Sequence, residues 1–364
     1  MSESFDIAIV GAGMAGASLA AEIGDAARVV VLEAEDTPGY HSTGRSAAFY
    51  EECYGGPGIL PLTKASGIYL QEHGFLSPRG ALYLAREDDE AAVESFITRF
   101  AETDARFERI GRNQLEQIVP GIRPEWDRAI RQPHCADIDV AGLHAHYLAR
   151  ARVAGAAITC RARIERITRD TSWLIETGDG RAFRADMLVN AAGAWADEIA
   201  AMAGVRALGI QPYRRTVVQL RIDPPAPADL PLCLDISGGF YFKPEAGRLW
   251  LSPHDEAPTP PVDAAPEELD VAIAIDRLQA AVNWKIEAVE RKWAGLRSFA
   301  PDRLPVYGPD PQVPGFFWFA GQGGFGIQTA PAAARLGAQV LLGCGPDAMT
   351  AAIDPGRYSP ARFY

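Results

Sequence analysis

The sequence is poor in cysteine and in long apolar runs. The cysteines form no CxxC pair, which argues against a zinc site, so no metal is expected, and against a disulfide-stapled secreted domain. They are Cys53, Cys135, Cys160, Cys233 and Cys344. No stretch approaches about 18 uninterrupted apolar residues, and no basic segment precedes an apolar one at the N-terminus. We therefore expect no transmembrane segment and a cytoplasmic location.

The chain also lacks an excess of positive charge. Its 35 basic and 47 acidic residues give a net charge of −12, and such a balance repels phosphate backbones, so nucleic acid is not expected as a partner. No repeat recurs along the chain at solenoid spacing. The 364 residues suffice for about two domains. An anionic ligand must therefore meet a local cluster of cationic side chains.

Three segments show a buried strand followed by a glycine turn and a helix. The predicted strands are residues 5–10, 185–190 and 315–320. The first strand leads into a predicted helix at 14–23 and a second strand at 28–33, and the last leads into a helix at 331–342. Short apolar strands alternating with helices are typical of a parallel sheet. Because the segments are far apart, this domain is predicted to be discontinuous, over residues 1–80, 141–210 and 300–364.

The remaining residues have a different sequence pattern. Alternating patterns such as TVVQLRI and GFYFKP are typical of antiparallel strands with one wet face. Helices are predicted at 88–103 and 267–282, and the proline-rich stretches 223–231 and 257–266 are predicted surface connections. A second domain is expected over residues 81–140 and 211–299.

The turn after the first strand has the form GxGxxG. Gly11 permits the turn, Gly13 lets a diphosphate approach the backbone, and Gly16 lets the helix pack on the sheet. A diphosphate there meets the free N–H groups at the helix start, around Met14 and Ala15. Glu33 ends the next strand, where a carboxylate can accept from an adenosine ribose. The ligand is predicted to be a dinucleotide.

Three further features favour FAD over NAD. The loop PGYHSTGRSAA offers small hydroxyls and a cation for phosphate and ribitol groups, through Ser42, Thr43, Arg45, Ser46, Ala47 and Ala48. The turn AAGAW offers a second close backbone approach at Ala192, Gly193 and Trp195. The segment GQGGFGIQT offers a third at a helix start, with Gly323, Gly324, Gly326, Ile327 and Gln328. Such a helix start stabilises a reduced isoalloxazine anion.

These motifs carry a resemblance to a known family. GAGMAG, HSTGRSAA, LVNAAGAWAD, QPYRR, GFYFKP, WAGLRSF and GQGGFGIQT occur in the order seen in the FAD-dependent D-amino-acid oxidase-like (DAO) superfamily. The sequence most resembles bacterial D-arginine dehydrogenase and related D-amino-acid dehydrogenases. The resemblance implies an α/β FAD-binding domain of glutathione-reductase type, with a βαβ Rossmann-like core, plus an α+β substrate domain with an antiparallel sheet. It adds Ile164 and Gly295 to the expected cofactor contacts. No cysteine stands near the start of GQGGFG, so the FAD is expected to be noncovalent.

The resemblance also implies catalytic residues. Arg215, Tyr241 and Arg297 match the family's carboxylate-binding positions, and Tyr54, in the glycine-rich stretch YEECYGGPG, matches the tyrosine of a mobile lid. The implied reaction is oxidative deamination of a free D-amino acid to a 2-oxo acid and ammonia, with hydride leaving Cα for flavin N5. Gly324 is expected to border the substrate.

Three substrate-pocket positions depart from the D-arginine dehydrogenase pattern. Ala81 stands where a glutamate would bind the substrate guanidinium, Phe49 replaces a histidine, and Glu51 replaces a threonine. A cationic side chain without a carboxylate partner would be desolvated at a cost of several kcal/mol. We therefore expect a preference for neutral or apolar D-amino acids, unless Glu51 turns inward and compensates.

Several alternatives stay open at this stage. The same carboxylate clamp would serve glycine, sarcosine and other N-methyl amino acids, or 2-hydroxy acids. The chain could also be a flavin-binding module of an RNA-modifying or regulatory protein, or an NAD-binding regulatory protein. No motif distinguishes oxygen from a quinone or a dye as the electron acceptor.

Overall fold

The first strand, glycine turn and helix form where the apolar pattern predicts them. The computed structural model describes residues 3–364. Strand β1 (Glu3–Val10) leads through the turn into α1 (Met14–Ile23), and β2 (Val29–Leu32) returns beside β1 in parallel. Every residue of β2 is buried, as expected for a strand covered on both faces. The unit is therefore a βαβ crossover that leaves the glycine turn at the carboxyl end of β1.

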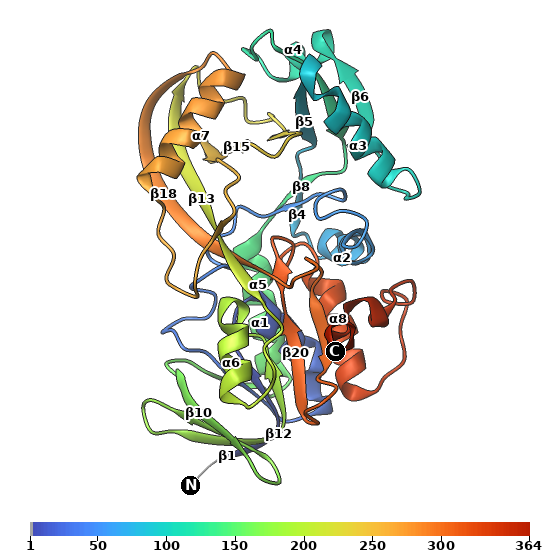
Figure 1. Cartoon of the computed structure of the whole chain (residues 1–364), viewed down its shortest axis with the longest axis vertical. Helices are drawn as coiled ribbons and strands as arrows, with labels where there is room; N and C mark the ends of the chain where they lie inside the picture. The colour runs from blue at the N-terminus through green and yellow to red at the C-terminus, as the bar shows by residue number, and fades with distance from the viewer. Residues whose placement is uncertain (1–2) are drawn as a thin grey trace.

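The first sheet is built around this unit and lies at the lower end of Figure 1. Its strand order is β10, β11, β12, β1, β2, β9, with β20 beside β12 and β19 beside β20. The added strands are β9 (Ala157–Thr159), β10 (Ile164–Arg169), β11 (Trp173–Thr177), β12 (Ala182–Asn190), β19 (Val306–Pro309) and β20 (Phe316–Ala320). Strands β9, β2, β1, β12 and β20 are mutually parallel.

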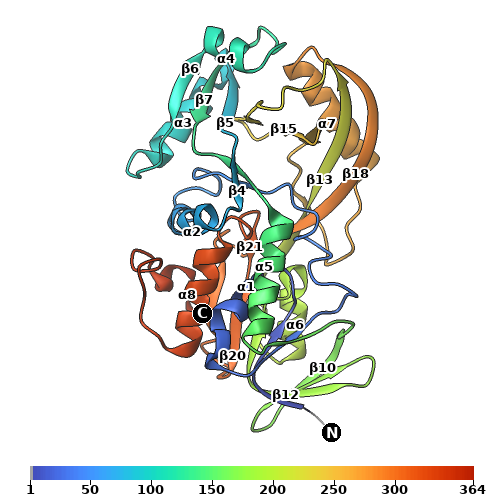
Figure 2. The ribbon, with the colours of Figure 1, turned by 180° about the vertical axis from the view of Figure 1, so that it is seen from behind.

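Helices cover both faces of the first sheet. Because successive strand residues point to opposite faces, Ile7 and Ile9 pack with α1, whereas Ala8 and Val10 belong to the core on the other side. The first face is covered by α1, α5 (Val140–Val153) and α8 (Ala330–Leu342), and the second by α6 (Ala196–Met202). Figure 2 shows α1, α5 and α8 from behind.

The second sheet forms the other lobe and is antiparallel except where β14 pairs with β5. Its order is β21 (Gln322–Gly323), β18 (Lys285–Phe299), β13 (Gln211–Asp223), β16 (Arg248–Ser252), β15 (Tyr241–Glu245), β14 (Leu232–Asp235), β5 (Ala81–Arg86), β7 (Trp126–Gln132) and β6 (Glu108–Gly111), with β17 (Ala257–Pro258) beside β13. Helices α4 (Arg112–Ile118) and α7 (Glu268–Ala281) pack on one face, and α3 (Glu90–Phe100) packs against the other.

A small third sheet connects the two lobes. It contains β3 (Phe49–Tyr50), β8 (Ala136–Ile138) and β4 (Leu76–Pro78), and α2 (Leu60–Glu72) lies beside it in both views (Figures 1 and 2). None of these strands was predicted, because two or three residues are too few to show a period. Short 3-10 helices complete the structure at Gly24–Ala26, Glu87–Asp89, Gly193–Trp195, Pro355–Tyr358 and Pro360–Phe363.

The fold class expected from the sequence is confirmed, with small shifts at the ends of elements. The helix predicted at 88–103 is α3, which begins only at Glu90 after a 3-10 turn. The proline-rich stretch from Ala257 begins with the two-residue strand β17. The expected domain division stays a proposal, and β21 lies in the part assigned to the first domain while pairing with β18 of the second sheet. Across residues 3–364, no helix has the length and apolarity needed to cross a membrane.

Candidate functional site

A single open cavity extends from the glycine turn of the first sheet to the second sheet. Its lining includes Gly11 and Glu33 at one end and Arg215, Tyr241 and Arg297 at the other. The empty space is about 1800 Å³, open solvent at its mouth included. One continuous cavity thus reaches from the glycine turn to the two arginines.

The glycine turn brings the backbone close to this cavity. Gly11 has φ +99°, and a Cβ atom there would lie 2.6 Å from the carbonyl oxygen of Ala191. A Cβ atom at Gly16 would lie 1.9 Å from the Gly11 carbonyl oxygen, so α1 packs against its own entry turn. In the described part of the chain no side chain caps α1 at Gly13, which leaves the positive end of the helix open for an anion.

Two side chains fix the shape of the turn. The Glu33 carboxylate accepts hydrogen bonds from the backbone N–H groups of Ala12 (2.9 Å) and Glu35 (3.0 Å). Each carboxylate oxygen can accept a further bond, as a ribose hydroxyl would require. The Thr43 hydroxyl accepts from the Met14 N–H at 2.9 Å, which ties the HSTGRSAA loop to the start of α1.

Arg45 lines the cavity and is also bonded within the protein. Its guanidinium donates to the carbonyl oxygens of Ala264 (2.9 Å) and Ala294 (3.2 Å) and pairs with Asp263. These three bonds account for part of its five N–H donors, and phosphate binding by Arg45 stays a prediction. Arg45 therefore holds the loop in place against the second sheet.

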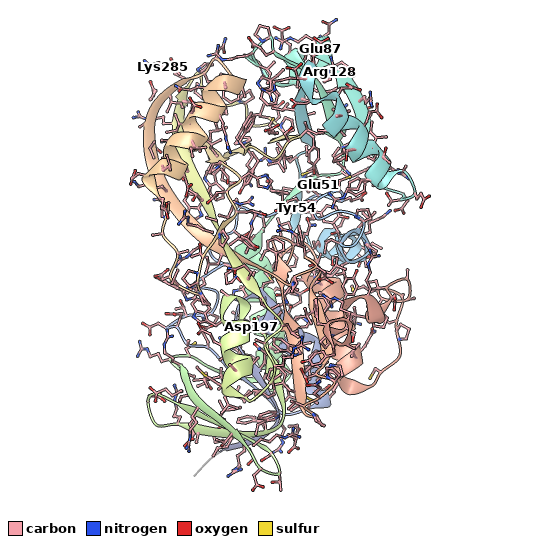
Figure 3. The ribbon with its side chains drawn as sticks, viewed as in Figure 1. Glu51, Tyr54, Glu87, Arg128, Asp197 and Lys285 are labelled. Atoms are coloured by element: carbon pink, nitrogen blue, oxygen red, sulfur yellow. The ribbon has the colours of Figure 1, made fainter. Side chains whose placement is uncertain are left out.

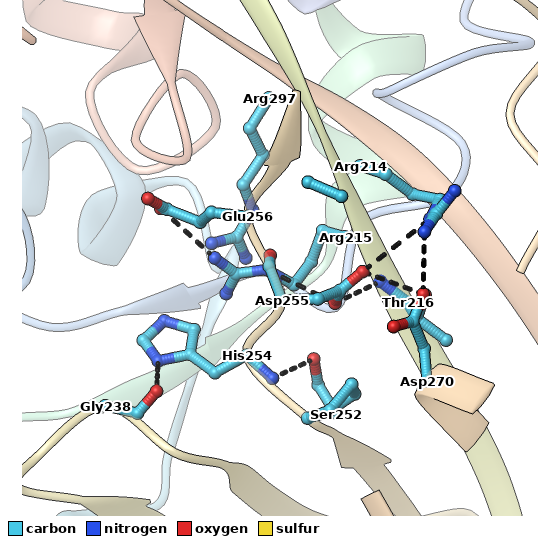
Figure 4. A network of polar contacts seen from close by, with 12 residues as sticks. Arg214, Arg215, Thr216, Gly238, Ser252, His254, Asp255, Glu256, Asp270 and Arg297 are labelled. Atoms are coloured by element: carbon cyan, nitrogen blue, oxygen red, sulfur yellow. Dashed lines mark hydrogen bonds and ion pairs between the residues drawn. The ribbon is translucent and has the colours of Figure 1, made fainter. Parts of the chain in front are cut away.

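Strand register brings the two clamp arginines together. On the antiparallel pair β13 and β18, Arg215 stands opposite Gly295 and Arg297 stands opposite Tyr213. Arg215 and Arg297 are thus diagonal neighbours on one face, a relation that places side chains about 7–8 Å apart at their bases. Gly295 leaves space beside Arg215. Figure 4 shows the two guanidinium groups next to each other.

Arg215 is buried and incompletely paired. Its side chain is 4% exposed, Nε donates to the Asp255 carbonyl at 2.7 Å, and Nη2 donates to Glu256 Oε1 at 3.3 Å. Within residues 3–364, Nη1 has no hydrogen-bond partner. Burial, together with the neighbouring charge of Arg297, lowers the pKa of Arg215 to about 10, so it stays charged at neutral pH. An unpartnered N–H beside a second cation favours an anionic ligand.

Aromatic side chains surround the clamp. Arg297 Nη1 donates to the Tyr54 hydroxyl at 2.6 Å. Phe49 lies between Tyr54 and Tyr241, with ring centroids 5.2 and 6.1 Å away. His254 packs edge-on against Tyr241 at 5.8 Å, and burial with the nearby arginines lowers the pKa of His254 to about 2. The imidazole is therefore neutral.

Most sequence-predicted contacts fall on the cavity. All expected cofactor residues line it except Gly16, Ala48 and Gln328. They are Gly11, Gly13, Met14, Ala15, Glu33, Ser42, Thr43, Arg45, Ser46, Ala47, Ile164, Ala192, Gly193, Trp195, Gly295, Gly323, Gly324, Gly326 and Ile327. Their individual roles stay predictions.

Other predicted site residues lie elsewhere. The Gln328 side chain is 2% exposed and bonds to Thr63 Oγ1 (3.0 Å), the Tyr54 carbonyl and the Glu51 N–H, so it braces the Tyr54 loop. Phe49, Glu51 and Ala81 lie outside the described cavity lining. Glu51 is fully buried and accepts from the Tyr83 hydroxyl (2.5 Å) and the Cys53 N–H (2.9 Å). Its carboxylate therefore bonds within the protein and is not part of the cavity lining. Figure 3 shows Glu51 and Tyr54 between the lobes.

Sequence reasoning missed the acidic residues beside the clamp. The two acids, Asp255 and Glu256, follow β16, and a further cation, Arg303, follows β18. All three belong to the same ion-pair network as Arg215. The stretch SPHDEAP contains no motif that indicates this role. Its two acids reach the site because β16 pairs with β13. The arginine-rich β13 was the available signal for a charged partner nearby.

Comparison with known proteins decides the family. The model of the DAO family, described as FAD dependent oxidoreductase, matches residues 6–340. This chain belongs to that family. FAD-dependent oxidoreductase domain-containing protein 1 of Mus musculus is 26% identical over 424 residues, covering 100% of this chain and 85% of the mouse protein. FAD is accordingly the cofactor.

Solved structures show the same fold. The L-proline dehydrogenase from P. horikoshii has a TM-score of 0.85 at 22% identity and covers 100% of this chain and 98% of its own. The glycine oxidase from Geobacillus kaustophilus has a TM-score of 0.84 at 22% identity and covers 98% of each chain. Neither is a D-arginine dehydrogenase, so the expected closeness to those enzymes stays a prediction.

The residues present fit FAD. The open start of α1, the close approach at Gly11 and the Glu33 carboxylate suit its adenosine diphosphate half. The small residues Gly323, Gly324 and Gly326 border the cavity near Arg297, whose guanidinium would lie 3.2 Å from a Cβ atom at Gly324. A Cβ atom at Gly324 would also lie 2.6 Å from the Tyr54 hydroxyl, so glycine there lets the clamp side chains approach this segment.

Proposed function

We propose that this protein oxidises a free α-amino acid with an uncharged side chain and passes the electrons to FAD. The observation that carries the proposal is the placement of Arg215 and Arg297 on adjacent strands of the cavity that starts at the glycine turn, with Arg215 Nη1 buried and unpartnered. Charge-assisted bonds from a guanidinium to a carboxylate contribute about 1.5–3 kcal/mol each. A small carboxylate is the ligand that this arrangement favours.

In the mechanism, the protein binds and orients the substrate. Arg215 and Arg297 hold the carboxylate, and the Tyr54 and Tyr241 hydroxyls restrict its rotation. Fixing the carboxylate fixes Cα, and such positioning accounts for much of the rate in reactions of this kind. When bound, FAD would supply the two-electron acceptor for the hydrogen that leaves Cα. The substrate imine is then hydrolysed to a 2-oxo acid and ammonia.

The side-chain preference is proposed from the acids near the clamp. Glu51, which could have paired with a cationic side chain, is buried and already bonded to Tyr83 and Cys53. Phe49, Tyr54, Tyr241 and Val217 belong to one apolar cluster. A guanidinium placed against it would lose its hydration without a carboxylate partner. Neutral and apolar amino acids are therefore the proposed substrates.

The D configuration is proposed from the motif resemblance. The names of the structural neighbours, an L-proline dehydrogenase and a glycine oxidase, support amino-acid oxidation and extend the test to the L series, glycine and N-methyl amino acids. The cytoplasm is the proposed location, for which the scatter of the cysteines is the support.

Anaerobic mixing tests the proposed function. Purified protein is mixed with D- and L-alanine, D-phenylalanine, D-arginine, sarcosine and D-lactate while flavin absorbance is followed, and air is then admitted. Rapid bleaching by a neutral D-amino acid and little by D-arginine is expected. Bleaching by D-lactate or sarcosine alone would show that the substrate is a 2-hydroxy acid or an N-methyl amino acid. Absence of bleaching by every compound would favour a flavin-binding module. Rapid return of the colour in air would identify oxygen as an acceptor, and slow return would favour a quinone or a dye.

A further inference from the structure

Glu256 lies between two arginines at the clamp. Its Oε1 atom is 3.3 Å from Arg215 Nη2 and 2.9 Å from Arg303 Nη2, and its Oε2 atom is 3.0 Å from the same Arg303 nitrogen. Arg215 is 4% exposed, whereas the side chains of Glu256 and Arg303 are 37% and 48% exposed. One carboxylate thus links the buried clamp to a cation at the surface; Figure 4 shows Glu256 beside Arg215.

The neighbouring charges are held by other partners. The Asp255 carboxylate accepts from the N–H and hydroxyl of Thr216, at 2.7 and 3.0 Å, and stands 3.9 Å from Arg215 Nε. Arg214 pairs with Glu267 and with Asp270. These bonds fix Asp255 and Arg214. Among the described residues, the Glu256 side chain is fixed by ion pairs alone, and an exposed pair such as Glu256 with Arg303 contributes little, about 0–1 kcal/mol.

The backbone beside this pair is strained at two positions. His254 has φ +57° and Arg303 has φ +64°, conformations that cost a non-glycine residue about 1–3 kcal/mol and persist where the surroundings hold them. The Arg303 guanidinium also stacks on Phe299, 3.9 Å from the ring centroid. Both segments are therefore held in place beside the clamp, and Arg303 is in position to keep Glu256.

We propose that the Glu256 carboxylate pairs with the Arg215 guanidinium until a substrate carboxylate arrives, and that it then pairs with Arg303 alone. The proposal rests on the proposed function, since it assigns the clamp to a carboxylate. In the structure, Glu256 compensates part of the charge of a buried guanidinium that has one orphan nitrogen. A substrate carboxylate bonds to the same guanidinium, and two carboxylates on one cation repel each other. Arg303 removes this conflict by retaining Glu256.

The consequence is that Glu256 and Arg303 are positioning residues that set affinity. Removing the charge of Glu256 removes a competitor for Arg215, so carboxylates bind more tightly. Removing Arg303 leaves Glu256 with Arg215 as its remaining partner, so carboxylates bind less tightly. Neither change alters the hydride step once substrate is bound.

Calorimetric titration of the FAD-loaded protein with benzoate, a monocarboxylate without an oxidisable Cα–H bond, tests the exchange. Glu256→Gln is expected to lower the benzoate Kd about two- to fivefold, and Arg303→Gln to raise it by a similar factor, the range of an exposed ion pair. In the double variant the effect of Arg303→Gln disappears. Asp302→Asn removes a neighbouring charge of the same sign that pairs with Arg362, and it leaves the Kd unchanged.

The outcomes separate this proposal from the proposed function. A higher Kd for Glu256→Gln, or an Arg303→Gln effect that persists in the double variant, overturns the exchange. The limiting rate of flavin reduction at saturating amino acid stays at the wild-type value in both single variants, and a large fall would make Glu256 or Arg303 part of the chemistry instead. If the wild type binds benzoate but no amino acid bleaches its flavin, the oxidation proposal fails while the exchange stands. If the wild type does not bind benzoate, the clamp and the exchange both fail.

Discussion

The two ends of the cavity are built by different means. At the FAD end, glycine turns bring backbone close to the ligand, and Gly11 and Gly16 allow contacts that any Cβ atom would block. At the clamp end, side chains converge from β13, β15 and β18, and their acidic partners come from the loop after β16. The first end depends on local backbone conformation, and the second depends on strand register. Substitutions should therefore separate loss of cofactor from loss of substrate.

The largest effect is expected at the FAD end. Gly11→Val places a branched Cβ 2.6 Å from the Ala191 carbonyl oxygen, in a conformation with φ +99°. We expect a colourless protein with a lowered Tm, checked by absorbance and thermal unfolding. Gly24→Ala is the matched control, because φ is +62° there and nothing lies within 4 Å. A Gly11→Val protein that binds FAD as tightly as the wild type would contradict the close approach.

The next largest effect is expected at the clamp. Arg215→Met removes the guanidinium with the orphan Nη1, and loss of charge-assisted bonds of about 1.5–3 kcal/mol each corresponds to about a hundredfold or greater fall in kcat/KM. The flavin should be retained, because Arg215 is not among the expected FAD contacts. Arg214→Met is the control, since Arg214 pairs with Glu267 and Asp270. Equal losses in both variants would show a general effect on β13.

The same contrast decides what the sequence could predict. The strand, turn and helix of residues 5–23 and the residues of the HSTGRSAA loop could be predicted from local sequence pattern. The cofactor was predicted from the same motifs. Arg215, Tyr241 and Arg297 were named through the family resemblance, because strand register is not readable from one sequence. The acids Asp255 and Glu256 were missed for the same reason. Phosphate binding by Arg45 was predicted from residue type and stays a prediction, whereas its bonds to Asp263 and two carbonyls depend on the tertiary fold.

A smaller effect, on stability, is expected at Glu51. Burial raises the pKa of Glu51 to about 7, above the value of an unfolded glutamate, about 4.3. The folded state then binds more protons than the unfolded state between these pH values, so the free energy of unfolding falls as pH rises from about 4.3 to about 7, by up to about 3 kcal/mol. Urea unfolding at pH 5 and pH 7.5 measures this change in the free energy of unfolding. Glu51→Gln removes this slope and Glu52→Gln keeps it; an unchanged slope in Glu51→Gln would contradict the burial argument.

The smallest effect is expected at the lid position. Tyr54→Phe removes the hydroxyl that accepts from Arg297 at 2.6 Å while keeping the ring, so KM should rise about three- to tenfold with little change in kcat. Steady-state kinetics across several amino acids checks this. Tyr69→Phe is the control, because its hydroxyl also accepts from an arginine, Arg150 of α5, but neither residue belongs to the cavity lining. Unchanged kcat/KM for every substrate would remove Tyr54 from substrate capture.

The expected mode of FAD attachment can be checked on the same preparation. Because no cysteine lies near the start of GQGGFG, acid precipitation should release all the flavin into the supernatant. Yellow colour that stays with the pellet would show a covalent bond.

The central claim is that FAD and a pair of arginines share one cavity. A crystal structure of the protein with FAD and benzoate tests this most directly. The account predicts the benzoate carboxylate within hydrogen-bond distance of Arg215 Nη1 and Arg297, with the flavin ring in the same cavity. A carboxylate bound elsewhere, with Arg215 Nη1 still lacking a ligand partner, would contradict it.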